Sequence, residues 1–254
     1  MQLQVASATL AALLLGTARG TGFVLFAPPF NSSAIPTPVK GALALALSVV
    51  VRDRIASGLP GLSAGYLIVA TLSEVAIGAA LGFIVQLFFT AVQMAGDLID
   101  VSGGFSLQPA YDPMSMTTHA NVGKLQYVLA STLLFTSGGH LVIVKGFVTS
   151  YQALPVGANL PTQQLSHVLI QAFSMMFLAA LQIAGPMVAV LLLADVALAL
   201  LSRAAPALNV FAMGFPVKIM LTLALLGLTF PLLPSALDTL ISQAMHAISA
   251  LKGG

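Results

Sequence analysis

Residues 64–101 read AGYLIVATLSEVAIGAALGFIVQLFFTAVQMAGDLIDV, and this nearly continuous apolar stretch decides the fold. Apolar residues over so many positions are typical of a membrane helix. As one unbroken helix the stretch would be roughly 55–60 Å long, whereas the hydrocarbon core of a bilayer is about 30 Å thick. Residues 163–203 have the same excess length. We therefore expect both helices either to extend beyond the bilayer against other subunits or to bend at Gly78, Gly82, Gly96 and Gly185-Pro186.

The composition places the whole chain in the membrane class. Of its 254 residues, 58% are hydrophobic and 6% are charged, whereas soluble domains carry about 25% charged residues. We expect an all-α integral membrane protein with a single domain over residues 1–254 and no appended soluble domain. The first segment lacks a basic start, so we expect a retained helix rather than a signal peptide. Apolar continuity, Pro and Gly predict helices at about 3–26, 37–56, 64–101, 119–151, 163–203 and 216–250.

The sequence disfavours several classes of function. The nine Lys and Arg residues are spread along the chain and form no patch that could hold a nucleic acid. The absence of cysteine excludes disulfides, thiol catalysis and thiolate metal sites. The four histidines lack metal-ligand spacing, and no serine lies in a G-x-S-x-G motif. We expect no enzymatic activity, no cofactor, no bound metal and no nucleic acid partner.

A polar stretch, GGFSLQPAYDPMSMTTHAN at residues 103–121, interrupts two apolar segments. It contains two prolines and many hydroxyl and amide groups, and its only charged residue is Asp112. At membrane depth, a backbone without regular hydrogen bonds is tolerated only where it is buried in protein or lines a wet cavity. The stretch is therefore either an ordinary surface loop or part of a conduit.

Five ionisable residues lie inside apolar segments. Each costs roughly 2.5–3.5 kcal/mol at a helix centre on insertion scales, so each needs a partner or water. They are candidates for function, for structural pairing or for subunit contacts: Arg19, Glu74, Asp97, Asp100 and Asp195. Asp97 and Asp195 also offer a weak likeness to the paired carboxylates of an intramembrane aspartyl protease, which would require the two to lie within hydrogen-bond reach.

Two pairs of glycines have the spacing of close helix contacts. Gly16-x-x-x-Gly20 and Gly78-x-x-x-Gly82 each place small residues on one helical face. A second helix can approach such a face closely because no side chain stands between the backbones.

A series of short motifs runs in order along nearly the whole chain, from Arg19-Gly20-x-Gly22-Phe23 to Lys218. Between these limits the motifs are Asp97-Leu98-Ile99-Asp100, Gly104-Phe105-Ser106, Asp112-Pro113, Gly139-His140, Ser150-x-x-x-Leu154-Pro155 and Pro206-x-Leu208-Asn209-Val210-Phe211-x-x-Gly214-Phe215-Pro216-Val217-Lys218. In their order and spacing, these motifs resemble the FliR family of flagellar type III export.

This resemblance implies a non-enzymatic subunit of the protein export gate in the bacterial inner membrane, at the flagellar basal body. Its partners would be FliP, FliQ, other export apparatus proteins, membrane lipid and the unfolded export substrates. The implied assembly stands largely above the bilayer and surrounds a closed channel. That would explain helices too long to span, since their apolar faces would meet neighbouring subunits instead of lipid.

The resemblance also implies a channel plug at about residues 105–121. Glycine would allow the tight backbone path, proline and polar residues would hold the loop, and methionine and phenylalanine would seal it. The plug candidates are Gly103, Gly104, Phe105, Ser106, Leu107, Gln108, Pro109, Asp112, Pro113, Met114, Met116 and Asn121. Asn209, Phe211 and Lys218 are assigned to a second polar turn at a helix break, and with Pro216 they are further structural or subunit-contact candidates.

Two alternatives stay open. The virulence, or injectisome, homologue has the same implied architecture, so the chain could serve a virulence export gate. A polytopic secondary transporter is the second alternative, and it would carry paired, broken helices in two similar halves. The chain has no convincing internal repeat, which speaks mildly against a transporter.

Overall fold

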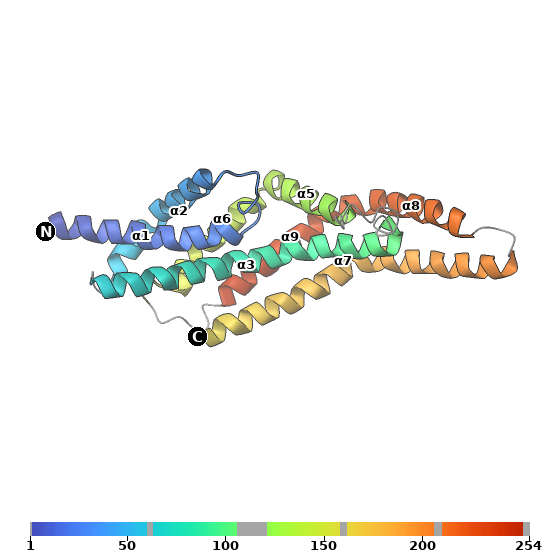
Figure 1. The fold of residues 1–254 in the computed structure, drawn as a ribbon. Coiled ribbons are helices and arrows are strands. Elements are labelled where there is room, and N and C mark those ends of the chain that lie inside the picture. The colour runs from blue at the N-terminus through green and yellow to red at the C-terminus, as the bar shows by residue number, and fades with distance from the viewer. Residues whose placement is uncertain (1, 60–62, 106–120, 158–161, 206–209, 251–254) are drawn as a thin grey trace. The chain divides into compact units, whose positions relative to one another are not determined.

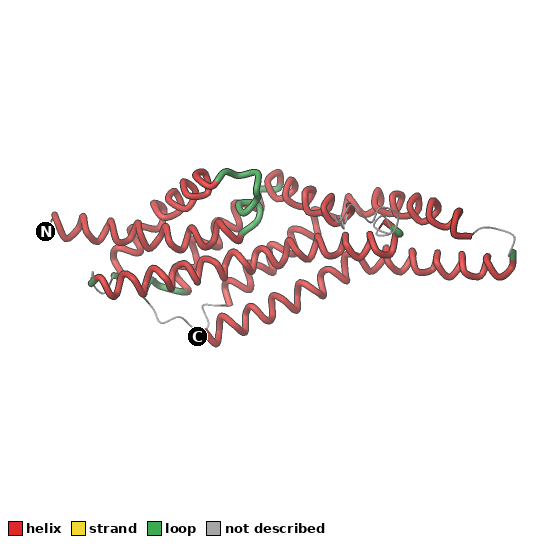
Figure 2. Tube along the Cα trace, viewed as in Figure 1, coloured by secondary structure: helices red, strands yellow, loops and turns green. Residues whose placement is uncertain are grey.

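The computed structural model describes residues 2–59, 63–105, 121–157, 162–205 and 210–250, and every regular element in this part is a helix (Figures 1 and 2). The all-α prediction is therefore confirmed. In chain order the elements are α1 (Gln2–Phe26), α2 (Thr37–Gly58), α3 (Ala64–Gly103), α5 (Asn121–Thr136), α6 (Gly139–Ala153), α7 (Thr162–Ala204), α8 (Val210–Thr229), the 3-10 turn η2 (Phe230–Leu232) and α9 (Leu233–Ala250).

The two longest helices are continuous. Helix α3 has 40 residues and α7 has 43, which correspond to about 60 and 65 Å of helix. Bending of α3 at its glycines was one of the two expectations, and it is wrong, because the helix runs through Gly78, Gly82 and Gly96. Helix α7 likewise continues through Gly185 and Pro186. Both helices are therefore longer than a bilayer core is thick.

Two segments predicted as single helices are broken instead. The segment predicted at 119–151 divides into α5 and α6 at a break after Thr136. Gly138, with φ of 76°, lies at this break and adopts the left-handed conformation that glycine reaches without steric cost. The last segment begins at Val210 rather than 216, and it is interrupted by the 3-10 turn Phe230–Leu232.

The described helices support the membrane class. Four helical stretches are long and apolar enough to cross a membrane: Ser7–Phe26, Ala64–Gly103, Thr162–Ala204 and Met213–Ser249. The bent pair of α5 and α6 would make a fifth span if it crosses as one broken unit. The chain is thus an all-α membrane protein.

Contacts between residues divide the chain into two compact units. Unit 1 contains Met1–Phe88, Gly138–Ser174 and Thr239–Gly254, and unit 2 contains Phe89–Ser137 and Met175–Asp238. Helices α3 and α7 each contribute residues to both units because the division falls within them.

In unit 1, α1 packs against α2 and α3 at positions that carry no side chain. A Cβ atom added at Gly20 would lie 2.9 Å from the carbonyl oxygen of Ala44 in α2. A Cβ atom added at Gly78 of α3 would overlap with the carbonyl oxygen of Arg19 in α1. Both small-residue motifs therefore serve close helix contacts within the chain, as their spacing predicts.

Unit 2 has its own apolar core, built from four helices. Side chains of α3, α5, α7 and α8 form one buried cluster, with Phe105 packed against it. Its buried members are Ala95, Ile99, Val122, Ala184, Met187 and Leu226. The core thus brings the end of α3 and the start of α5 together, on either side of the polar stretch.

Candidate functional site

Unit 1 contains a buried ion pair. Arg19 on α1 is 0% exposed and Glu74 on α3 is 1% exposed. Nε of Arg19 donates to Glu74 Oε2 at 2.5 Å, and Nη2 donates to Oε1 at 2.9 Å. Two parallel hydrogen bonds between a guanidinium and a carboxylate add geometric specificity as well as energy. The pair joins α1 to α3 across 55 positions of sequence.

The end of α6 supplies the other contacts of this guanidinium. Arg19 Nη1 donates to Ser150 Oγ at 3.2 Å, and Nη2 donates to the carbonyl oxygen of Leu154 at 2.8 Å. The ring of Tyr151 lies under the guanidinium, with its centroid 3.8 Å from Cζ, which is cation–π geometry. Carbonyl groups at a helix end lack partners inside the helix, so an arginine is a favourable donor there.

Ser150 and Leu154 were named from the sequence only as members of a family motif, and Tyr151 was not named. The sequence shows a hydroxyl next to a tyrosine at the end of an apolar segment, which does not identify a partner for Arg19. Arg19 and Glu74 were named singly, as candidates for structural or subunit contacts. The structure brings these two together inside unit 1, with every contact described here made within the chain.

The N-terminal end of the polar stretch is held by unit 2. Gly103 is buried, and a Cβ atom added there would lie 2.7 Å from Oγ1 of Thr222 on α8. Gly104 has φ of 84°, a conformation that residues with a side chain rarely adopt. The ring of Phe215 lies beside Gly104, and Phe105 packs against the unit 2 core. The backbone can therefore leave α3 sharply because this position is a glycine.

The C-terminal end of the polar stretch is tied back to α3 by Asp100. The Oδ2 atom of Asp100 accepts hydrogen bonds from the backbone N–H groups of Val122 at 2.9 Å and Gly123 at 3.3 Å. The first N–H groups of a helix have no partner inside it, and a carboxylate there also meets the positive end of the helix dipole. Asp100 thus caps α5, whose first residue, Asn121, is exposed.

Most of the predicted plug lies outside the described residues. The structure describes Gly103, Gly104, Phe105 and Asn121 of the candidates. The remaining ones lie outside the described part of the chain, together with Asn209: Ser106, Leu107, Gln108, Pro109, Asp112, Pro113, Met114 and Met116.

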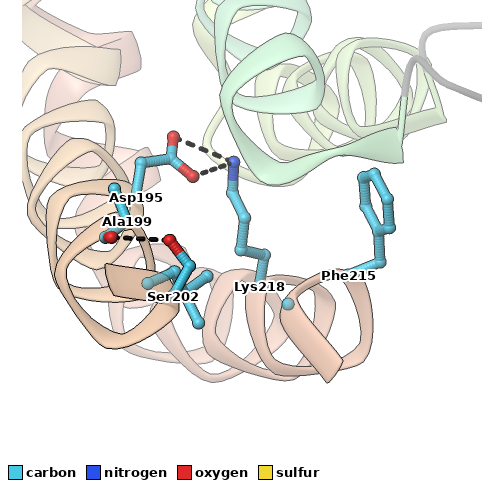
Figure 3. A pocket seen from close by; sticks show the side chains of 7 residues that line it. Asp195, Ala199, Ser202, Phe215 and Lys218 are labelled. Carbon is cyan, nitrogen blue, oxygen red and sulfur yellow. Dashed lines mark hydrogen bonds and ion pairs between the residues drawn. The ribbon is translucent and has the colours of Figure 1, made fainter. Parts of the chain in front are cut away.

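A second ion pair lies between α7 and α8 in unit 2. Lys218 Nζ donates to Asp195 Oδ2 at 3.0 Å and lies 2.7 Å from Oδ1, as the dashed lines in Figure 3 show. Here 49% of the aspartate side chain and 14% of the lysine side chain are exposed. The pair borders a cavity of about 350 Å³, which is lined by Asp195, Leu198, Ala199, Ser202, Gly214, Phe215 and Lys218.

The prediction of a polar turn around the second candidate group needs correction. Phe211, Pro216 and Lys218 lie within helix α8, and the helix continues through Pro216. Asp195 contacts Lys218, whereas Asp97 lies beside Gly123. These separate surroundings do not support a shared-proton pair of Asp97 and Asp195.

The α7 and α8 segments of unit 2 expose large apolar side chains along their length. In α7 these include Leu181, Leu192, Leu193, Val196 and Leu200, which are 51–68% exposed. In α8 they include Met213, Met220, Leu223 and Leu228, which are 57–73% exposed. Extended apolar surfaces of this kind mark contact with lipid or with other protein chains.

The charged contacts described above lie between helices. In the described part of the chain, no group of three or more His, Cys, Asp and Glu side chains could hold a metal ion. The two ion pairs and the Asp100 cap join helices to one another. Their geometry is therefore that of structural contacts.

Comparisons with known proteins agree with this picture. The family model described as "Bacterial export proteins, family 1" matches residues 10–244. The flagellar biosynthetic protein FliR of Escherichia coli K12 is 28% identical over 231 residues, which cover 91% of this chain and 88% of that protein. FliR of Bacillus subtilis 168 is 30% identical over 220 residues, 85% of this chain and 84% of that protein. The surface presentation of antigens protein SpaR of Salmonella typhimurium LT2 is 28% identical over 236 residues, 92% and 89% of the two chains.

Proposed function

The chain belongs to family 1 of the bacterial export proteins, and from that premise we propose that it is a non-enzymatic subunit of a flagellar type III export gate. In this proposal, residues 105–121 form a plug in a closed channel for unfolded export substrates. The resemblance of the sequence to the FliR family, whose members are among the chain's relatives, motivates both parts.

The observation that carries the plug proposal is the tie between the two ends of the polar stretch. Asp100, near the end of α3, binds the backbone of Val122 and Gly123 at the start of α5. The stretch is thereby anchored at both ends to one apolar core in unit 2. A segment that blocks a channel needs fixed ends, because a freely moving loop would lose conformational entropy each time it closed.

The assembly proposal is supported by helices that exceed the bilayer in length. Helices of 40 and 43 residues cannot lie wholly within a hydrocarbon core of about 30 Å unless they are strongly tilted. The exposed apolar side chains of α7 and α8 need cover wherever they leave the lipid. We propose that FliP and FliQ subunits supply that cover, in the inner membrane at the flagellar basal body.

Within the plug, we assign three roles by residue type. Gly103 and Gly104 permit the exit from α3, while Gln108, Pro109, Asp112 and Pro113 hold the loop conformation. Phe105, Met114 and Met116 seal the channel, because methionine can deform around a passing chain and repack.

Deletion of residues 110–118 tests the plug. If these residues close the channel, membranes that contain the assembled variant complex will leak small solutes, as measured by dye uptake into intact cells. A variant in which the same residues are replaced by a Gly-Ser sequence of equal length separates loop length from side-chain sealing. Normal impermeability of membranes that contain a fully assembled deletion complex would refute the plug assignment.

Purification with its genomic neighbours tests the assembly. A gate subunit should be recovered in a large hetero-oligomer with FliP and FliQ homologues, whereas a secondary transporter should be recovered alone and active. Recovery of a solitary, monodisperse protein from cells that express all three proteins would contradict the gate.

The match to SpaR favours one second candidate, a virulence type III export gate. Complementation distinguishes the two systems. The flagellar proposal predicts that the chain restores motility to a strain without its own FliR. Restored secretion in a strain without SpaR, with no gain of motility, would favour the virulence system.

A further inference from the structure

Three oxygen-bearing side chains gather where α3 and α5 cross in unit 2. Asp97 and Asp100 come from α3, and Gln126 comes from α5. All three lie around Gly123: a Cβ atom added at Gly123 would overlap with Asp97 Oδ1, and Asp100 accepts the N–H of Gly123. A Cβ atom added at Gly96 would lie 2.9 Å from Gln126 Oε1 and 2.7 Å from Gly123 N, so the amide faces the same point.

Each of these three side chains has a buried oxygen atom that accepts no hydrogen bond from the described residues. Asp100 is 2% exposed and Gln126 is 3% exposed. The atoms Asp97 Oδ1, Asp100 Oδ1 and Gln126 Oε1 are all buried and have no hydrogen-bond partner among the described residues. The two backbone N–H groups at the site, from Val122 and Gly123, both donate to the other oxygen of Asp100. A buried acceptor left unsatisfied costs about 1–3 kcal/mol, and more when it is charged.

Among the described residues, no ion pair brings a lysine or arginine to these carboxylates. The ion pairs of the described residues join Arg19 to Glu74, Arg52 to Asp53 and Lys218 to Asp195, and none of them reaches this crossing. The start of α5 supplies about half of one positive charge, against two carboxylates three residues apart on α3. Like charges so close together on one helical face repel each other, and the apolar core beside them strengthens the repulsion.

We propose that Asp97, Asp100 and Gln126 bind a hard divalent cation, Mg²⁺ or Ca²⁺, at this crossing. Two carboxylates and an amide carbonyl form an all-oxygen set, which such cations prefer to the nitrogen and sulfur ligands of zinc or copper. A charge of +2 balances the two carboxylates, so the bound site is neutral within the protein. The cation ties α3 to α5 at the two ends of residues 104–120, in addition to the Asp100 cap.

Calorimetric titration and thermal unfolding of the purified, fully assembled protein with MgCl₂ or CaCl₂ test this site. One of the two salts should bind and raise the unfolding temperature, whereas NaCl at matched ionic strength should not. Asp97→Asn removes one charge but keeps the Asp100 cap, and it should weaken binding by at least about tenfold. Asp238→Asn removes an exposed carboxylate elsewhere in unit 2 and should bind as the wild type does.

Gln126→Met serves as a second variant, because it removes the neutral ligand at similar volume and without a change of charge. It should also weaken binding if the amide oxygen is a ligand. Equal binding by wild type and Asp97→Asn would overturn the proposal, as would the absence of heat and of stabilisation with both salts. A stabilisation that NaCl reproduces would assign the effect to ionic strength and would overturn it too. The outcome is independent of any leakage through the proposed plug.

Discussion

In the described part of the protein, two ion pairs join one helix to another, and they lie in opposite surroundings. Arg19 and Glu74 in unit 1 have side chains that are 0% and 1% exposed, whereas Lys218 and Asp195 in unit 2 have side chains that are 14% and 49% exposed. The buried pair is completed by a hydroxyl, a carbonyl and an aromatic ring from α6. The exposed pair borders a cavity and an apolar helix surface.

This difference separates a contact that stabilises the chain from one that another chain can reach. A buried charge is tolerated only when it is paired and hydrogen-bonded, and Arg19 meets that requirement within unit 1 through its carboxylate partner and two further acceptors. An exposed pair contributes little to folding, because water and salt screen it. We therefore expect substitutions at the first pair to change the stability of the chain, and substitutions at the second to change what it binds.

Glu74→Ala should cause the largest loss of stability, because it acts on the buried pair. It leaves the Arg19 guanidinium buried without its carboxylate, and removal of one partner of such a pair typically costs about 3–5 kcal/mol. Chemical unfolding of the purified protein in detergent measures the change in unfolding free energy.

The double variant Arg19→Met with Glu74→Leu is the matched control. It removes both charges and fills the space with apolar groups, so it should recover most of the lost stability. If the double variant is as unstable as Glu74→Ala, the loss does not come from an unpaired buried charge.

Gly78→Ala tests the helix approach that positions the buried pair. The added methyl group would overlap with the carbonyl oxygen of Arg19, so α1 and α3 must separate by about 1 Å. Overpacking of this kind costs about 1–3 kcal/mol, and the same unfolding measurement detects it. Gly65→Ala, in the same helix but with open space around it, should be neutral or slightly stabilising.

The sequence was sufficient to predict the long helices because their signals are local. Apolar runs continue for many residues, and Pro and Gly mark several of their ends; the start of α2 at Thr37-Pro38 is one example. The break between α5 and α6 was missed, since no proline marks it and apolar residues continue on both sides. Gly138-Gly139 was the only local sign of it.

The partners of the candidate residues could not be predicted in the same way. The cost of charge in an apolar segment identifies Arg19 and Glu74 singly, but their pairing depends on how α1 crosses α3. Gln126 was not identified as a site residue from the sequence, because a single amide side chain in an amphipathic segment is common. Only the crossing of α3 and α5 places it beside Asp97 and Asp100.

Tyr151→Leu tests how much the aromatic ring stabilises the buried pair, because it removes the ring and leaves both charges in place. Loss of the ring under the guanidinium and of its edge contact with Phe147 should cost about 1–2 kcal/mol. Tyr151→Phe keeps both ring contacts and should cost less than half of that. Equal losses in the two variants, in the same unfolding measurement, would show that the ring stacking is not what stabilises Arg19.

Asp195→Asn with Lys218→Met should give the smallest change in folding and thereby test the other side of the comparison. Because the pair is partly exposed, the unfolding free energy of the purified chain should change by no more than about 1 kcal/mol. If another subunit covers this surface of α7 and α8, the yield of assembled complex should fall while the isolated chain stays folded. The exchanged pair, Asp195→Lys with Lys218→Asp, keeps the internal attraction but reverses the charges that a partner meets, so it should assemble no better. A loss of unfolding free energy as large as that of Glu74→Ala would mean that the difference in burial does not explain the difference between the two pairs. Normal assembly of the exchanged variant would mean that no partner subunit binds through these charges.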